Sequence, residues 1–213
     1  ERTMGYQVAL HTNSGLAHQV RNARALLAGF NAHGISAVIA DADMDAPLHV
    51  VQGPWYALER WRFANTLYID RAYWGDPDSA SVHWLQDGEK LRTRNNPYRP
   101  HPPLAPMREG SRRIHLCDYG EQPPNDCDYR RHPADGATGS LADALEGYQI
   151  AAGRRTTALV DAAIAGLAVE TDDLHSPVYG ITDRQQWITD LAWHNWTLDE
   201  IERGAMWAHF KPQ

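Results

Sequence analysis

Residues 148–171 constrain the fold of this chain more than any other stretch. An apolar run over residues 148–152 leads into Gly153, and Arg-Arg-Thr-Thr at positions 154–157 opens a helix-like run that ends at Gly166. A second apolar run, over residues 167–171, follows directly. This order predicts a strand, a tight turn, a helix, a glycine stop and another strand, which is the repeating unit of parallel α/β sheets.

The turn after Gly153 also has the chemistry of a phosphate site. The first amides of a helix lack partners within the helix, and the helix dipole favours an anion beside them. Arg154 and Arg155 would add positive charge, while Thr156 and Thr157 would add hydroxyl donors. Because any α/β helix can start with this pattern, a phosphate site and an ordinary capped helix are both open interpretations.

The chain begins with the same strand–helix–strand order. An apolar strand over residues 8–12 precedes a helix that Gly34 ends, and a strand over residues 37–40 follows. The apolar residues of this helix are spaced three and four apart and share one face: Leu16, Val20, Ala23, Leu27 and Phe30. Further strands are predicted over residues 49–53, 66–70, 81–85, 113–117 and 129–132, and short helices over 58–64 and 141–146. Capping boxes at Thr182–Gln185 and Thr197–Glu200 predict the starts of two closing helices.

A proline-rich segment separates the two halves of the chain. Five prolines fall within residues 94–111, a density that excludes regular secondary structure and predicts a linker or an extended surface loop. A length of 213 residues suits one large domain or two small ones. We expect an α/β protein of two small Rossmann-like lobes with parallel sheets, residues 4–107 and 108–213, and a cleft between them.

Composition excludes several classes of protein. The 43% apolar fraction is typical of a globular chain, and a net charge of −7 argues against a general polyanion-binding protein. No apolar run approaches the ~20 residues of a membrane helix and no signal peptide is visible, so we expect a cytoplasmic protein without a membrane partner. The two cysteines, Cys117 and Cys127, belong to no visible cluster of four ligands, so neither a metal site nor a cofactor is predicted.

Several catalytic signatures are missing from the sequence. It has no P-loop, no Gly-x-Ser-x-Gly elbow, no His-Glu-x-x-His and no zinc-deaminase signature. The turn after the first strand lacks Gly-x-Gly-x-x-Gly, which argues against a Rossmann-type oxidoreductase.

Residues that could act in catalysis or ligand binding instead follow the predicted strands, at the edge where ligands bind in open parallel sheets. Asp70 ends one strand and could accept the proton of a hydroxyl, and His11 ends another. Arg131 and His132 could neutralise a diphosphate leaving group. Glu170 or Asp172 could bind a ribose, with His175 at the same edge. Each of these residues also has a purely structural interpretation. Asp70 could cap a loop, Arg131 and His132 could form a basic turn in solvent, and Glu170 and Asp172 could be surface acids.

Positive charge gathers over residues 90–113. Seven basic residues lie there against Glu109 alone: Lys90, Arg92, Arg94, Arg99, Arg108, Arg112 and Arg113. Together with Tyr98, arginines on an extended loop could follow a phosphate backbone.

Three segments resemble a known family. Arg131-His132-Pro133, followed by a short helix and Thr156 to Ala162, resembles the C-terminal half of GT-B type glycosyltransferases, in the branch of capsule-polysaccharide and glycerophosphate polymer transferases. The segment from Tyr68 to Asp76 looks like a motif of small phage-encoded glycosyltransferase-like proteins, some of which modify hydroxymethylated pyrimidines in phage DNA. Residues 193–204 resemble the same group.

This resemblance implies a minimal GT-B architecture and a metal-independent transfer of a sugar, from a nucleotide-sugar such as a UDP-sugar, to a hydroxyl. Arg131 and His132 would face the donor diphosphate, Thr156 and Thr157 would bind it, and Asp70 would be the base. When the resemblance is combined with the chemistry of the neighbouring residues, Arg154 and Arg155 are also expected at the diphosphate site, and His11 is the second candidate for the base. Arg92, Arg94, Tyr98 and Arg99 would contact the acceptor.

The expected acceptor is a 5-hydroxymethylpyrimidine in phage DNA, in the host cytoplasm, with a glycan or polyol as the alternative. A non-catalytic module that binds nucleotides or nucleic acid is the alternative of another class. The oligomeric state is left open.

Overall fold

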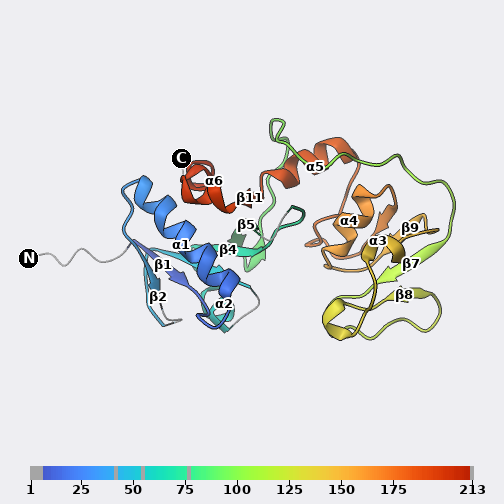
Figure 1. The fold of residues 1–213 in the computed structure, drawn as a ribbon, viewed down its shortest axis with the longest axis horizontal. Helices are drawn as coiled ribbons and strands as arrows, with labels where there is room; N and C mark the ends of the chain where they lie inside the picture. Colours follow the sequence, from blue (N-terminus) through green and yellow to red (C-terminus); the bar gives the residue numbers. More distant parts are fainter. Residues whose placement is uncertain (1–6, 41–42, 54–55, 76–77, 212–213) are drawn as a thin grey trace, which may run out of the picture. The chain divides into compact units, whose positions relative to one another are not determined.

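The computed structural model describes residues 7–40, 43–53, 56–75 and 78–211. The ends of the predicted lobes at residues 4–6 and 212–213, and Asp76 of the phage-like segment, lie outside the described residues. The chain forms two compact units, which are unit 1 (Glu1–Arg94 with Ala192–Gln213) and unit 2 (Asn95–Leu191). Each unit has a sheet with parallel strands and its own helices (Figure 1), which confirms the expected α/β fold with two Rossmann-like lobes.

Unit 1 is built on a sheet with the strand order β11-β5-β4-β3-β1-β2. Four neighbouring strands are parallel, as the sequence predicts: β1 (Val8–His11), β2 (Ala37–Ala40), β3 (Leu48–Gln52) and β4 (Thr66–Arg71). The chain runs from β1 outward to β2 and then crosses to β3 on the other side of β1. The strand order therefore reverses between β1 and β3, where open α/β sheets bind ligands.

The other edge of this sheet is antiparallel. β5 (Ser79–Gln86) runs against β4, and both β6 (Glu89–Lys90) and β11 (Asn195–Thr197) run against β5. Residues 72–78 are the whole connection between β4 and β5. Parallel pairing needs a crossover of a dozen or more residues. A connection as short as this one therefore makes β5 an antiparallel partner of β4.

The C-terminal residues belong to unit 1, which differs from the predicted lobe boundaries of 4–107 and 108–213. β11 pairs with β5, and α6 (Leu198–Glu202) and α7 (Ala205–Phe210) pack on α1 (Ala17–Ala32). The approach of α1 to α6 is close, because a Cβ added at Gly29 would lie 2.1 Å from the carbonyl oxygen of Ile201. The Phe30 and Trp207 rings pack 5.0 Å apart between their centroids.

The buried face of α1 is rotated from the predicted one. Ala23 and Phe30 are buried as expected, but Leu26 is fully buried while Leu27 and Val20 are only half-buried and Leu16 is exposed. Gly34 follows the helix with a φ of +70°, as its predicted role as a stop requires. The short helix predicted over residues 58–64 is α2 (Tyr56–Trp61).

Unit 2 contains a four-stranded sheet with the order β10-β9-β7-β8, and all of its pairs are parallel. The strands are β7 (Arg113–Leu116), β8 (Asp128–Arg130), β9 (Ile150–Ala152) and β10 (Ala168–Glu170). A 3₁₀ turn (Pro133–Asp135) and α3 (Leu141–Ala144) connect β8 to β9, and α4 (Ala158–Ile164) connects β9 to β10. The strand order reverses between β7 and β9, so these two strands mark the expected ligand edge of unit 2.

The proline-rich segment has no helix or strand from residue 91 to residue 112, as predicted. Within unit 2 it is bound to the α4–β10 connection. The amide of Ala105 donates to Ile164 O at 2.9 Å, and that of Arg108 donates to Gly166 O at 2.8 Å. Gly166, at φ +87°, must be glycine because an added Cβ would lie 2.1 Å from Pro106 O. The segment is thus an extended part of the unit 2 surface.

Only one of the two predicted capping boxes forms. Thr197 and Glu200 exchange both bonds of the box at the start of α6. At α5 (Arg184–Ala192) the cap is Asp183, whose Oδ1 accepts from the amides of Gln185 and Gln186 at 2.9 and 3.2 Å, so the box predicted from Thr182 is wrong. The helix begins at Arg184, which places Asp183 rather than Thr182 directly before its first residue.

Candidate functional site

Polar residues follow every strand of the unit 2 sheet at its carboxyl edge. Cys117 and Asp118 follow β7, the central strand at the switch point. Arg131 and His132 follow β8 on one side of it, and residues 154–157 follow β9 on the other. Residues 171–175 follow β10. The tertiary fold therefore brings the sequence-predicted donor residues to one edge of one sheet, on both sides of β7.

Gly153 sets how closely the turn after β9 approaches β7. Its amide donates to Glu170 O at 3.2 Å, and an added Cβ would lie 2.6 Å from Leu116 O. A side chain at position 153 would therefore push β9 away from the end of β7. Because glycine is present, Arg154 and Arg155 emerge directly beside Asp118.

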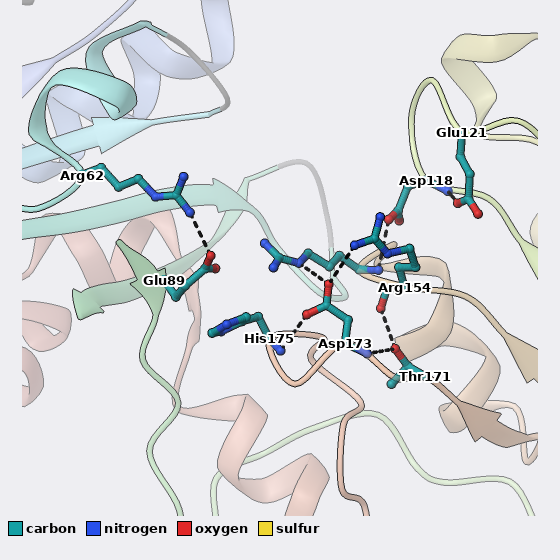
Figure 2. A network of polar contacts seen from close by, with 9 residues as sticks. Arg62, Glu89, Asp118, Glu121, Arg154, Thr171, Asp173 and His175 are labelled. Atoms are coloured by element: carbon teal, nitrogen blue, oxygen red, sulfur yellow. Dashed lines mark hydrogen bonds and ion pairs between the residues drawn. The ribbon is translucent and has the colours of Figure 1, made fainter. Parts of the chain in front are cut away.

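Asp173 connects the turn after β9 with the loop after β10 (Figure 2). Its Oδ2 accepts from Nε of Arg155 at 2.6 Å and lies 3.8 Å from Nη2 of Arg154. Its Oδ1 accepts from the amide of His175 at 2.9 Å. Thr171 donates to the carbonyl oxygen of Arg154 at 3.1 Å, which adds a second bond between the two segments. Two arginines thus converge on one carboxylate of which only 7% is exposed.

Asp118 binds the same turn from the side of β7. Its Oδ2 accepts from the amide of Arg155 at 3.2 Å. Burial raises the pKa of the Asp118 carboxyl above its ordinary value, although the Arg155 amide opposes this effect. The Arg155 amide is therefore already bonded to a carboxylate.

The two threonines have different surroundings. Thr156 is half-buried, and its Oγ1 accepts from the amide of Ala158 at 3.4 Å. Thr157 is exposed at the N-cap position of α4 and makes no side-chain cap bond. Thr157 is therefore the more exposed of the two threonines at this turn.

Arg131 and His132 lie on the β8 side of β7. Arg131 is exposed, and no carboxylate of the described residues lies within ion-pair distance of it. Its positive charge acts on Cys117, which places it toward the end of β7. Nδ1 of His132 accepts from the amide of Ala134 at 3.2 Å, and its ring packs edge-on against Tyr119.

The predicted ribose-binding residues do not share one environment. Glu170 forms an ion pair with Arg113 at 2.9 Å, and Asp172 is exposed. His175 is half-buried next to Asp173, to which its amide donates.

Asp70 lies near the carboxyl end of β4 in unit 1, with one third of its side chain exposed. Its Oδ1 accepts from the amide of Arg71 at 2.8 Å, while Oδ2 lies 3.3 Å from both Nζ of Lys90 and the Tyr68 hydroxyl. Burial, and then the Asp70 charge, raises the pKa of Tyr68, so this phenol stays protonated and can donate to the carboxylate. Asp70 is an accessible carboxylate held in one orientation.

His11 ends β1 and is fully buried. Its Nε2 lies 3.0 Å from Nδ1 of His49, and both rings stack on Trp61. Burial, and then the neighbouring His11, lowers the pKa of His49 to about 4. This pair is packed like a core element.

The predicted acceptor-contact residues span the boundary between the two units, which falls after Arg94. Arg92 is half-buried, and burial followed by the charge of Arg94 lowers its pKa. Arg94 is exposed, Arg99 is half-buried, and Tyr98 is 70% exposed against His101.

Sequence reasoning missed the carboxylates at this edge. Asp118 and Asp173 each bind the arginine turn, although neither was singled out from the sequence. The sequence shows no cluster of four metal ligands, and the smaller group of His115, Cys117 and Glu121 was therefore not predicted. Their ligand atoms lie within 4.8 Å of one another. The spacing His-x-Cys-x-x-x-Glu at the end of a predicted strand was the available signal.

Comparisons with protein-family models, with curated proteins and with solved structures each found no match to this chain. Among the helices of the described residues, none has both the length and the apolar character needed to span a bilayer.

Proposed function

We propose that this protein is a glycosyltransferase that moves a sugar from a nucleotide-sugar donor to a hydroxyl. One observation carries the proposal. The six residues expected at the donor diphosphate follow β8 and β9, the two strands that flank β7 in the parallel sheet of unit 2. They are Arg131, His132, Arg154, Arg155, Thr156 and Thr157. A diphosphate above the end of β7 would have basic groups on both sides.

Two guanidinium groups are the best placed to bind that diphosphate. Arg131 is exposed, and Arg154 is 64% exposed with its carboxylate partner 3.8 Å away. Arg155 is bonded more tightly, to Asp173, and would act by holding the turn. Positive groups fixed where negative charge develops lower the barrier to departure of a diphosphate. The proposal therefore assigns the leaving-group charge to arginines, as a metal-independent mechanism requires.

Asp70 is the proposed base that deprotonates the acceptor. It is a partly exposed carboxylate at the carboxyl edge of the unit 1 sheet, and an amide and Lys90 fix its position. His11 is the weaker candidate, because its ring is fully buried against His49 and Trp61. A general base must come within hydrogen-bond reach of the proton that it removes.

The proposed acceptor is a 5-hydroxymethylpyrimidine in DNA. Arg94 and Tyr98 are the exposed members of the predicted contact set, and cationic and aromatic side chains are the groups that bind nucleic-acid strands. Glycan and polyol acceptors use the same chemistry and serve as the comparison in the assay.

Donor binding is tested first. Isothermal titration with UDP, GDP, ADP and their sugar conjugates should give saturable binding for one nucleotide. Arg131→Ala and Arg154→Ala should each weaken it by about tenfold or more, as loss of a charge-assisted bond does. Arg112→Ala is the matched control, because Arg112 lies at the opposite edge of the same sheet and is 60% exposed. Equal affinity in all three variants would remove these arginines from the site.

Turnover is tested separately. Incubation with the bound nucleotide-sugar and hydroxymethylated DNA should release nucleoside diphosphate, and Asp70→Asn should reduce this release by at least 10²-fold without changing donor affinity. Asp87→Asn is the control, since Asp87 is an exposed carboxylate in the same unit at φ 51°, a conformation that asparagine tolerates. Donor binding without turnover on any acceptor would favour the non-catalytic module.

A further inference from the structure

Three potential metal ligands come from seven consecutive residues of unit 2. His115 lies on β7, Cys117 follows the strand directly, and Glu121 lies in the next loop. The amide of Cys117 donates to Arg130 O at 2.9 Å, so the backbone stays paired with β8 beyond the last residue of β7. Side chains two residues apart on an extended strand point to the same side. His115 and Cys117 therefore share one side of the sheet.

The loop after β7 carries Glu121 back to these two side chains. Its amide donates to Asp118 O at 3.1 Å, and its Oε2 accepts from the amide of Asp118 at 2.7 Å. These two bonds fix the carboxylate, and its other oxygen, Oε1, lies 2.8 Å from Nε2 of His115. Figure 2 shows Glu121 directed back toward Asp118 in this way.

The spacing of the three ligand atoms suits one small ion. A ring nitrogen of His115, Sγ of Cys117 and a carboxylate oxygen of Glu121 all lie within 4.8 Å of one another. Ligand atoms at about 2.0–2.3 Å from one tetrahedral ion lie about 3.3–3.7 Å apart. The 2.8 Å contact between His115 and Glu121 is slightly shorter than this, and the 4.8 Å limit is longer. Side-chain rotations that move the ligand atoms by about 1 Å would bring all three within bonding distance of one ion.

We propose that His115, Cys117 and Glu121 bind one divalent transition-metal ion of the zinc type. A thiolate, an imidazole and a carboxylate are borderline-soft donors, which favour Zn²⁺ or Co²⁺ over Mg²⁺ and Ca²⁺. The thiolate and the carboxylate balance the two charges of the ion, as a partly buried site requires.

The partial exposure of two of the three residues would let water or a ligand reach a fourth position on the bound ion. Cys117 is 3% exposed, whereas the side chains of His115 and Glu121 are 19% and 23% exposed. Three protein ligands with an open position are typical of catalytic zinc sites. This site lies next to the arginine turn, since Asp118 is bonded to both Glu121 and Arg155, but it is proposed independently of the transferase activity.

The test uses the intact chain, stripped of metal by a chelator and titrated with Co²⁺. Wild type should bind one Co²⁺ per chain, with a thiolate-to-cobalt charge-transfer band in the near ultraviolet and visible d–d bands typical of tetrahedral geometry. Zn²⁺ should displace the cobalt and abolish both. The readout needs neither nucleotide nor turnover, so its failure leaves the transferase proposal untouched.

Variants assign the ligands. Cys117→Ser should abolish the charge-transfer band, and His115→Gln and Glu121→Gln should each weaken cobalt binding by at least about tenfold, since even outer-shell substitutions cost that much. Cys127→Ser and Glu109→Gln are the matched controls and should bind like wild type. Circular dichroism verifies that each variant folds. If Cys117→Ser, at a buried position, does not fold, the loss of cobalt binding in His115→Gln tests the site instead. No band in folded wild type, or a band that survives Cys117→Ser and disappears in Cys127→Ser, overturns the proposal.

Discussion

Asp173 accepts a hydrogen bond from Nε of Arg155 at 2.6 Å, and the side chain of this aspartate is only 7% exposed. Burial opposes its ionisation, but hydrogen bonds from Arg155 and the His175 amide outweigh that effect and hold the pKa of the carboxyl below its ordinary value. Asp173 is therefore charged at neutral pH, and it ties the turn after β9 to the loop after β10.

Replacing Asp173 should destabilise unit 2. Asp173→Ala removes the acceptor of Arg155 and of the His175 amide and should lower the free energy of unfolding by about 1–3 kcal/mol. Urea denaturation followed by circular dichroism measures this difference. Asp172→Ala, at the exposed neighbouring position, should change it by no more than about 0.5 kcal/mol. Equal effects of the two substitutions would contradict a structural role for Asp173.

The stability of unit 1 should fall in acid because of His49. The folded-state pKa of His49 is about 4, below the unfolded value of 6.5, so the folded protein binds this proton less readily. Its contribution is complete above pH 6.5 and is lost as the pH falls toward 4, by about 3 kcal/mol in total. Among the groups that face it, His11 adds to the lowering and Asp45 opposes it.

Denaturation curves between pH 7 and pH 4 measure this loss. His49→Gln should flatten the decline relative to wild type, because the variant has no proton to take up at this position. His18→Gln, at an exposed position on α1, is the control and should keep the wild-type slope. An unchanged slope in His49→Gln would exclude His49 as the acid-sensitive group.

Helix capping should distinguish two threonines that look alike in sequence. Thr197→Ala breaks an observed capping box and should lower the free energy of unfolding by about 1 kcal/mol. Thr182→Ala should have little effect, because Asp183 caps α5. Thermal denaturation compares the two, and a larger effect of Thr182→Ala would show that the cap of α5 is misassigned.

Gly29 should report the packing of the C-terminal helices on unit 1. Alanine is normally better than glycine inside a helix by about 0.5–1 kcal/mol. A Cβ at position 29 would lie 2.1 Å from Ile201 O, so Gly29→Ala should destabilise instead. Ala28→Gly, one residue earlier, should also destabilise, but through helix propensity alone. If Gly29→Ala raised the denaturation midpoint, α6 could not pack on α1 as described.

Much of the fold could be predicted because its signals are local. The strand over residues 37–40 has the predicted bounds, and the other predicted strands differ by a few residues at their ends. Glycines at a positive φ, such as Gly34 and Gly166, end helices where the sequence indicated. Apolar spacing and turn residues act on their immediate neighbours, so they are readable without the tertiary structure.

The candidate site could be predicted only in part. The residues after each strand were identifiable, since parallel strands present their carboxyl ends at one edge. The partners of those residues were not. Asp118 and Asp173 reach Arg155 from the loops after β7 and β10, and nothing in the local sequence distinguishes them from surface acids.

The sequence by itself determined which residues form strands and helices and which of them stand at strand ends, because side-chain periodicity, glycine and proline act through the local backbone. Only the tertiary structure decided that the last twenty-two residues return to unit 1, and that Asp173 and Asp118 bind the arginine turn. Those outcomes depend on contacts between residues far apart in the chain, which form only when whole faces of helices and sheets pack together.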